Sequence, residues 1–306
     1  MKILMISGDK HILIPGTVAY MRFELQKAQV EQLDVFVWPQ VHAMREISAA
    51  AFAGKYDVII AQDPFWRGLL AWHLARKTGA KLNIQVHTDL SAEAWFRRTF
   101  ASFLLRRVDS IRVVSEKLKE EITPHVQAPI SVLPVYVDAS RFVGLTRTTH
   151  PRFKKTILWV GRFEKEKNPG EAISILKTVR EAGVDAGLIM LGSGSLDRSL
   201  RALAKDLSVE FPGWQDPVSY TAMADVVVCT SLFESYGVSI IDALSAGVPV
   251  VAPDVGIAKE AGAIVVPRNG LASEVIRVLQ SGERGVLTLP LLNEVEWAHA
   301  WKETLI

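Results

Sequence analysis

The chain has 306 residues, which suits two domains of about 150 residues each. Its formal net charge is +2 and its basic residues are scattered, so we expect no nucleic-acid partner. Cys229 is the single cysteine, which allows no internal disulfide and no cysteine metal cluster, and no stretch has the length of apolar residues that a signal peptide or a membrane span needs. We therefore expect a soluble protein of a reducing, cytoplasmic compartment.

The chain begins with a predicted strand, helix and second strand. Lys2 to Ile6 is a short apolar run, which predicts a buried strand, and Thr17 is suited to cap a helix from Val18 to Gln32. Leu33 to Trp38 reads as the next strand. This order predicts a right-handed parallel unit, the start of a doubly wound sheet in an α/β fold.

The glycines after the first strand do not form a dinucleotide fingerprint. Gly8 and Gly16 are separated by His11–Ile14, whereas that fingerprint places its glycines as Gly-x-Gly-x-x-Gly in one turn. A hydride-transferring dehydrogenase is therefore disfavoured. Taken alone, both glycines suit plain turns.

A histidine and an aspartate follow another predicted strand. Lys81 to Val86 is the strand, and His87 and Asp89 come directly after it. Ligands of open parallel sheets bind just beyond the carboxyl ends of the strands. We therefore interpret both side chains as candidates for an active site, with a purely structural histidine as the alternative.

Residues 95–108 combine several aromatic residues with four arginines. On a helix Phe96, Phe100 and Phe103 would share a face, but Arg107 falls on the same face, so polar and apolar residues are poorly segregated. Two interpretations remain open. The segment is either a helix that covers the sheet or a surface for a lipid-linked or anionic acceptor, with peripheral contact at the inner face of a membrane.

A polar, basic stretch from Thr146 to Lys155 is predicted to link two domains, residues 1–146 and 147–306. A new strand over Thr156 to Val160 is followed by a glycine turn that offers Arg162 and Lys167. An arginine fork and a mobile lysine charge at a strand end suit a diphosphate. Solvated surface charge is the alternative.

The most informative stretch runs from Ser231 to Val251. A buried strand precedes it, Gly237 allows a sharp turn, and a helix is predicted from Val238 to Ala246. A helix N-terminus suits a phosphate, and the carboxylates of Glu234 and Asp242 suit sugar hydroxyls. The pattern indicates a site for a nucleotide-sugar.

The residues Glu-Ser-Tyr-Gly-Val-Ser-Ile-Ile-Asp-Ala-Leu-Ser-Ala-Gly-Val-Pro-Val-Val, 234–251, resemble the donor-site signature of the retaining family 4 glycosyltransferases. This resemblance implies the GT-B fold, two Rossmann-like doubly wound parallel-sheet domains facing a cleft. The N-terminal domain would be the acceptor side and the C-terminal domain would bind the nucleotide-sugar, with the last helix packed back on the first domain. Asp242 stands where the family usually has Glu.

The resemblance also implies roles for individual residues. Trp214 is open to two interpretations, stacking on the base or packing in the core. No acidic Asp-x-Asp pair follows a strand, so we expect no metal, with Arg162 and Lys167 in place of a cation. The residues expected at the site are His87, Arg162, Lys167 and Glu234 as catalytic; Gly161, Gly192, Gly194, Trp214, Ser235, Tyr236, Gly237, Val238 and Asp242 on the donor; and Gly8, Gly16 and Asp89 on the acceptor side.

These features predict a retaining hexosyltransferase that uses a UDP-, GDP- or ADP-sugar and needs no other cofactor. The acceptor is expected to be a sugar, a lipid-linked molecule or another small molecule. Two alternatives remain, a nucleotide-sugar epimerase on the same fold and a non-catalytic subunit that binds a nucleotide-sugar.

Overall fold

A computed structural model describes residues 1–38, 43–88, 90 and 93–305. The chain divides into two units. The first consists of Met1–Tyr136 with Leu292–Ile306, and the second of Val137–Leu291. The unit boundary thus lies at Tyr136, ahead of the stretch expected as a linker, and the last segment of the chain belongs to the first unit.

The first unit contains a parallel sheet with the order β2-β1-β3-β4-β5-β6 in the described part of the chain. Its strands are rich in Val, Ile and Leu, as expected where both faces of a sheet are covered. They are β1 (Lys2–Ser7), β2 (Gln32–Val37), β3 (Val58–Ala61), β4 (Lys81–Val86), β5 (Ser110–Val113) and β6 (Ile130–Val132).

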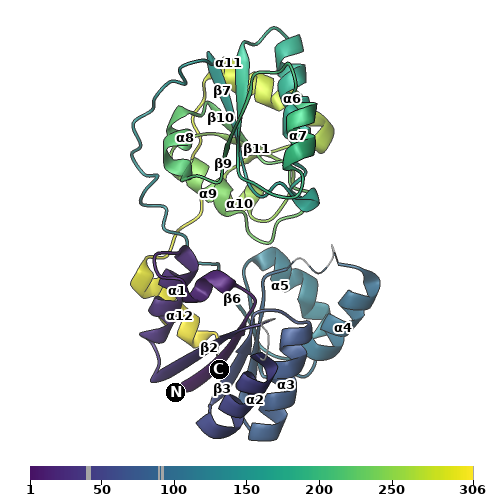
Figure 1. The fold of residues 1–306 in the computed structure, drawn as a ribbon, viewed down its shortest axis with the longest axis vertical. Helices are drawn as coiled ribbons and strands as arrows, with labels where there is room; N and C mark the ends of the chain where they lie inside the picture. The colour runs from purple at the N-terminus through teal and green to yellow at the C-terminus, as the bar shows by residue number, and fades with distance from the viewer. Residues whose placement is uncertain (39–42, 89, 91–92, 306) are drawn as a thin grey trace. The chain divides into compact units, whose positions relative to one another are not determined.

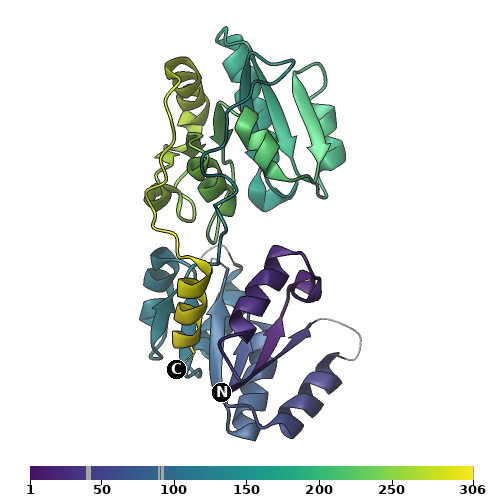
Figure 2. The same cartoon turned by 90° about the vertical axis from the view of Figure 1, so that its left-hand side faces the viewer.

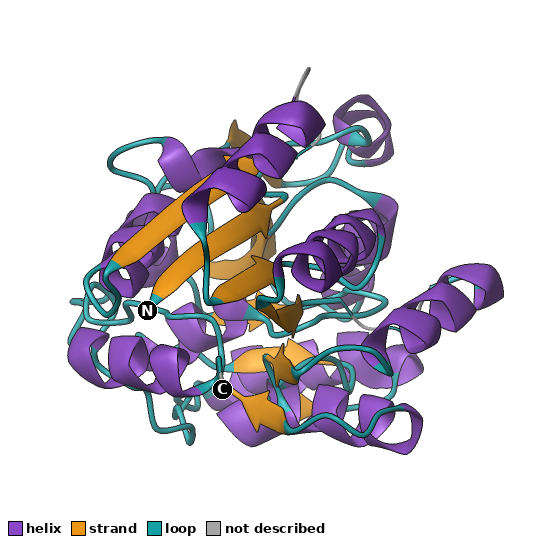
Figure 3. Cartoon of the chain, turned by 90° about the horizontal axis from the view of Figure 1, so that it is seen from below, coloured by secondary structure: helices purple, strands orange, loops and turns teal. Residues whose placement is uncertain are grey.

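Helices cover this sheet on both faces (Figure 3). Successive strand side chains point to opposite faces, and Ile3 and Met5 of β1 belong to the same buried cluster as Trp297 and Trp301 of the last helix. The helices of the unit are α1 (Val18–Lys27), α2 (Ala43–Gly54), α3 (Trp66–Thr78), α4 (Trp95–Leu105), α5 (Glu116–Ile122) and α12 (Glu294–Glu303).

The last helix, α12, completes the face on which α1 lies, and the two helices are in contact (Figure 1). Its residues follow the whole second unit in the sequence, yet the helix packs in the first (Figure 2). Asn293 caps it, accepting a hydrogen bond from the Glu296 amide at 3.0 Å. The indole Nε1 of Trp297 donates to the carbonyl of Pro134 at 2.8 Å, which fixes the helix against the end of the sheet.

The second unit contains a parallel sheet with the order β12-β11-β10-β7-β8-β9 among the described residues. This is the strand order of a dinucleotide-binding Rossmann sheet. In such a sheet the order in which successive strands are added reverses at the first strand, here β7. The strands are β7 (Lys155–Val160), β8 (Ala186–Leu191), β9 (Val209–Gly213), β10 (Val226–Val228), β11 (Val250–Ala252) and β12 (Ile264–Val265).

One core cluster of the second unit lies between this sheet and three helices. Ile157 and Trp159 of β7 are buried with residues of α6, α7 and α11. Figure 1 shows α6 and α7 on one side of the strands and α8 on the other. The helices are α6 (Pro169–Glu181), α7 (Asp197–Leu203), α8 (Pro217–Met223), α9 (Val238–Ser245), α10 (Ala258–Ala261) and α11 (Leu271–Ser281).

Within the described ranges, no helix has both the length and the apolar character that crossing a membrane would require.

Candidate functional site

The strand order of the second unit reverses between β7 and β10, and ligands of such sheets bind at this point, beyond the carboxyl ends of the strands. Two loops meet there, one after each strand. The hydroxyl of Thr230 donates to the carbonyl of Lys167 at 3.0 Å, and the amide of Leu232 donates to the carbonyl of Glu166 at 2.8 Å. The candidate residues of both loops are therefore held next to each other.

Lys167 and Glu234 form an ion pair at this point. The Lys167 Nζ lies 2.6 Å from Glu234 Oε1, and the hydroxyl of Ser231 donates to the same oxygen at 2.7 Å. Their side chains retain 20% and 13% exposure, so both can reach a ligand while being partly shielded from water. The sequence predicted each residue separately, and the fold brings them together.

Arg162 is more open. Its side chain is 62% exposed, and within the described chain its ion pair is with Glu166 on its own loop, at 2.8 Å. The guanidinium therefore keeps most of its hydrogen-bonding capacity for a bound anion.

Glycines allow the turn after β8 to pack on the loop that carries Arg162. Gly192 has φ +152°, and a Cβ there would lie 1.8 Å from the carbonyl oxygen of Gly161. A Cβ on Gly194 would lie 2.6 Å from the carbonyl oxygen of Phe163. The expected Gly-x-Gly turn is thus in direct backbone contact with the expected diphosphate loop.

Gly237 precedes α9 with φ +110° and provides no side-chain cap. The first amide to bond within the helix is that of Ile240, which donates to the carbonyl of Gly237 at 3.0 Å. The amides of Val238 and Ser239 come before this bond and have no partner within the helix, which leaves them available to an anion. Ser235 is half-buried beside this turn, whereas Tyr236 is buried, and burial raises the pKa of its phenol to about 12.

Asp242 lies one turn into α9 and is half-buried. Burial raises the pKa of its carboxyl to about 7, the positive charge of Arg141 opposes this increase, and Asp138 adds to it. This carboxyl therefore changes its charge near neutral pH.

Trp214 follows β9 and is 69% exposed, so the ring does not pack in the core. Of the two interpretations made from sequence, the core role is wrong, while stacking on a base stays a prediction.

Arg268 and Glu171 also belong to this region, and the sequence analysis missed them. The guanidinium of Arg268 donates to Glu171 Oε2 at 2.8 Å and to the carbonyl of Thr230 at 3.0 Å, and it also bonds the carbonyl of Ser231. Arg268 thereby supports the loop that carries Glu234. Arg268 comes shortly after the two-residue strand β12, which was not among the strands predicted from sequence.

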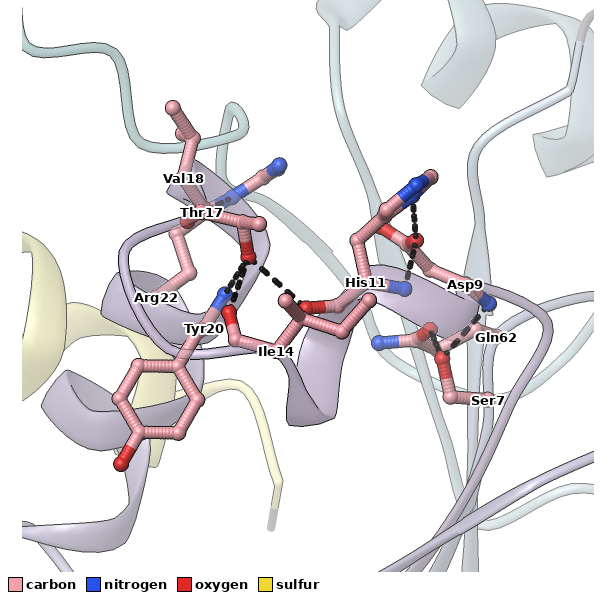
Figure 4. Close-up of polar contacts among 9 residues, drawn as sticks. All are labelled: Ser7, Asp9, His11, Ile14, Thr17, Val18, Tyr20, Arg22 and Gln62. Carbon is pink, nitrogen blue, oxygen red and sulfur yellow. Dashed lines mark hydrogen bonds and ion pairs between the residues drawn. The ribbon is translucent and has the colours of Figure 1, made fainter.

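The first unit has its own pocket of about 310 Å³, placed where its strand order reverses between β1 and β3. The hydroxyl of Ser7 donates to Gln62 Oε1 at 2.6 Å and accepts from the amide of Asp9 at 3.0 Å (Figure 4). The bond between Ser7 and Gln62 joins the ends of β1 and β3. The polar residues that line the pocket are Asp9, Arg22, Gln26, Gln62, Gln85, His87 and Arg112.

His87 lies in this pocket. The residue as a whole is half-buried, but its Nε2 is enclosed and has no hydrogen-bond partner among the described residues. Burial lowers the pKa of the imidazole to about 3, and the positive charges of Arg112 and Arg22 lower it further. The ring is therefore neutral at ordinary pH, and the residue lines the pocket while its Nε2 is enclosed.

The acceptor-side glycines differ in their positions. Gly8 lines the pocket, whereas Gly16 is in a turn with φ +83° and is not among the lining residues. Asp89 lies outside the described residues. Arg22, Gln85 and Arg112 were not anticipated, because a polar residue within a strand or helix carries no sign of the cavity it faces.

The described ranges contain no group of three or more His, Cys, Asp or Glu side chains that could hold a metal ion.

Comparison with known families gives two adjoining matches. The profile described as "Glycosyl transferases group 1" matches residues 154–281, and that described as "Glycosyl transferase 4-like domain" matches residues 13–135.

Individual relatives agree with this result. A glycogen synthase of Mycobacterium tuberculosis is 31% identical over 254 residues, 76% of this chain and 57% of the relative. A D-inositol 3-phosphate glycosyltransferase of Pseudarthrobacter chlorophenolicus is 26% identical over 263 residues, 76% of this chain and 62% of the relative. The chain thus spans about 60% of the length of these two curated relatives.

Among solved structures, sucrose-phosphate synthase from Thermosynechococcus elongatus matches with a TM-score of 0.74 and 16% identity, covering 100% of this chain and 95% of the other. At this identity the match shows a shared fold.

Proposed function

Because the chain belongs to the family 4 glycosyltransferases, we propose that it transfers a hexose from a nucleoside-diphosphate sugar to an acceptor hydroxyl with retention of configuration. The observation that carries the proposal is the Lys167–Glu234 ion pair beside the open N-terminus of α9. A diphosphate needs cations and amides, a sugar needs carboxylates, and this corner of the second unit offers all three.

In this proposal the diphosphate replaces the ion pair. Arg162 and Lys167 bind the phosphate oxygens and stabilise the negative charge that grows on the leaving diphosphate, in place of a metal ion. Lys167 then turns from Glu234, whose carboxylate accepts hydrogen bonds from the sugar hydroxyls. Asp242 accepts hydrogen bonds from the ribose, the amides after Gly237 bind phosphate, and Trp214 stacks on the base.

The acceptor is assigned to the pocket of the first unit. His87, neutral because of its lowered pKa, places a ring nitrogen in that pocket without adding a charge, and so can hydrogen-bond a sugar hydroxyl. Gly8 lines the same pocket, and a Cβ there would lie 2.6 Å from the guanidinium carbon of Arg67.

The test is a thermal-shift and transfer assay with UDP-, GDP- and ADP-sugars, without added metal. One donor is expected to raise the melting temperature, because ligand binding to the native state stabilises it. Lys167→Ala is expected to lower transfer by about 100-fold or more, since it removes a charge that stabilises the leaving group.

Lys165→Ala is the matched control, because Lys165 is an exposed lysine on the same loop and should leave transfer unchanged. Equal loss in both variants would contradict the role of Lys167. Donor turnover without any acceptor would instead indicate an epimerase, and donor binding without turnover would indicate a non-catalytic subunit.

We also propose peripheral contact with the inner face of a membrane through residues 95–108. In support, Trp95 at the start of α4 is 78% exposed, and Phe96 beside it is also exposed. Arg97 and Arg107 instead lie over Phe65 and Phe103, so they contribute to the surface of the unit itself.

Sedimentation with vesicles tests this contact. Binding to anionic vesicles that Trp95→Ala weakens is expected, because interfacial tryptophans insert at the headgroup level. Equal sedimentation of the variant would contradict it.

A further inference from the structure

The pocket of the first unit contains two arginines that the transfer reaction as proposed does not use. We propose that this pocket recognises an acceptor that carries an oxyanion, a phosphate or a carboxylate, and that Arg22 and Arg112 bind it. This inference rests on the proposed function, because it identifies the chemical class of the acceptor.

Arg112 is a buried cation. Its side chain comes from β5 and is almost completely enclosed. It donates from Nε to the carbonyl of Leu133 at 3.1 Å, from Nη1 to Gln85 Oε1 at 3.2 Å and from Nη2 to the carbonyl of Pro134 at 2.9 Å. A guanidinium has five N–H groups, so these bonds to described residues leave two for a ligand.

No carboxylate in the described part of the chain forms an ion pair with Arg112. Burying a charge without a counter-charge is costly, and burial lowers the pKa of this guanidinium to about 9, with the charge of Arg22 acting in the same direction. A bound oxyanion would supply the missing negative charge.

Arg22 lines the same pocket from α1. It is half-buried, and its Nε donates a hydrogen bond to the carbonyl of Val18 at 3.3 Å, within its own helix (Figure 4). Burial lowers its pKa, while the charge of Asp9 partly compensates. The two arginines thus act on each other electrostatically across one small pocket.

The remaining polar groups agree with an anionic ligand that also has hydroxyls. Gln85 is buried, and its Nε2, which can only donate, has no partner among the described residues. The carboxylate of Asp9 also lines the pocket, and its Oδ1 accepts a hydrogen bond from the amide of His11 at 2.9 Å. The donors therefore gather near Arg112, whereas Asp9 and Gln62 offer acceptor oxygens for hydroxyl groups.

The volume limits the size of the ligand. At about 310 Å³ the pocket is at the lower end of the range for small-molecule sites. A single sugar or polyol unit with one phosphate or carboxylate fits this size. We therefore expect a sugar phosphate, a polyol phosphate or a sugar acid.

Isothermal titration on the full chain tests the proposal without any need for turnover. The probes are inorganic phosphate, acetate, glycerol 3-phosphate, hexose phosphates, hexuronic acids and the uncharged parent hexoses. At least one oxyanion is expected to bind, more tightly than its uncharged counterpart. The phosphate and carboxylate arms distinguish the two anions, and glycerol 3-phosphate stands for a phospholipid headgroup.

Arg22→Gln is the decisive variant, because among the described residues Arg22 has no hydrogen bond or ion pair that ties two elements together. It should weaken oxyanion binding by about tenfold or more, as expected for loss of a charge-assisted hydrogen bond. Arg112→Lys, which keeps the charge but not the fork, should weaken it as well. Lys27→Gln is the matched control, since Lys27 is an exposed cation on the same helix, and it should bind like the parent chain.

Three results would overturn the proposal: no oxyanion binds, the uncharged hexose binds equally well, or Lys27→Gln weakens binding as much as Arg22→Gln. Donor binding in the second unit is measured on the same samples. Its retention in Arg22→Gln separates a failure of this inference from a failure of the proposed transferase activity.

Discussion

His87 and Asp242 both have strongly shifted pKa values, and both shifts come mainly from burial. Burial disfavours whichever form is charged, so His87 stays neutral down to about pH 3 while Asp242 stays partly protonated up to about pH 7. The same cause therefore makes one residue insensitive to pH in the physiological range and the other sensitive to it.

Asp242→Asn should reveal this sensitivity. The folded-state pKa of Asp242, about 7, is above its ordinary value of 3.8. The protonated carboxyl therefore contributes stability below about pH 4, and this contribution is lost as the pH rises through about 7. The asparagine variant has no charge to bury. Between about pH 5 and pH 8 its free energy of unfolding should therefore rise relative to that of the parent chain by roughly 1–3 kcal/mol.

Urea unfolding at several pH values measures this difference. Asp185→Asn, at an exposed aspartate of the same unit, is the control and should show no such trend. A difference between Asp242→Asn and the parent that stays constant with pH would contradict the prediction.

At the scale of single residues, the sequence predicted which residues belong to a site better than it predicted which residues they contact. Lys167 and Glu234 were both expected at a ligand, but their contact depends on the neighbouring positions of β7 and β10 in the sheet. Arg112 lies in an apolar strand, where nothing local distinguishes a buried guanidinium from a surface one. Its partners, Gln85 and Leu133, come from other strands or loops.

At the scale of elements, the predictions were good where local signals are strong. The first helix begins at Val18 with Thr17 as its cap, as was expected. The first helix was predicted to reach Gln32 but ends at Lys27, because Gln32 already pairs with Lys2 in the sheet. Pairing between strands overrides local helix propensity, and sequence periodicity does not register it.

The packed glycine turn after β8 allows a sharp test. Gly192→Ala adds a Cβ where the carbonyl oxygen of Gly161 would be 1.8 Å away and where φ is +152°. Backbone must move to relieve this contact, so we expect a loss of roughly 2–4 kcal/mol in the stability of the second unit, and weaker donor binding.

Gly183→Ala is the control for that substitution. Gly183 also has a positive φ, +83°, but nothing lies within 4 Å of its Cβ position. It should cost only about 1–2 kcal/mol, from backbone strain. Equal melting temperatures for the two variants would show that the turn does not pack against the loop of Gly161.

At the scale of the whole molecule, alternating strands and helices were sufficient to predict two parallel sheets. They were not sufficient to give the order of the strands, which differs between the two units. Both candidate sites lie where that order reverses. The sequence therefore predicted which loops carry the site residues, but not how those loops are placed next to each other. Non-local pairing carries this information.

The first unit depends on a helix made from the end of the described chain. Trp301 of α12 is fully buried, and Trp297 packs on Tyr136 with ring centroids 5.9 Å apart. Trp301→Ala should therefore destabilise the first unit by about 3–5 kcal/mol, the usual cost of removing a large buried side chain.

Hydrogen exchange read separately for the two units measures this effect. Amides of β1 and β3 should exchange faster in the variant, whereas those of β7 and β8 should not change. Trp95→Ala, at an exposed tryptophan of the same unit, is the control. Faster exchange in both units would show that they unfold together.

The first unit is formed from two segments that are far apart in the sequence, and this affects how it can fold during synthesis on the ribosome. Residues 1–136 emerge first but lack the helix that covers one face of their sheet, and the 137–291 unit is made before that helix appears. Domains that are contiguous in sequence can fold as they emerge. The second unit meets this condition and the first does not. The pocket of the first unit, whose wall includes Trp297, is therefore completed only after the candidate site of the second unit has had time to form. A chain cut short before residue 292 would carry a finished second unit and an unfinished first unit, whose apolar sheet face would be exposed to chaperones and proteases.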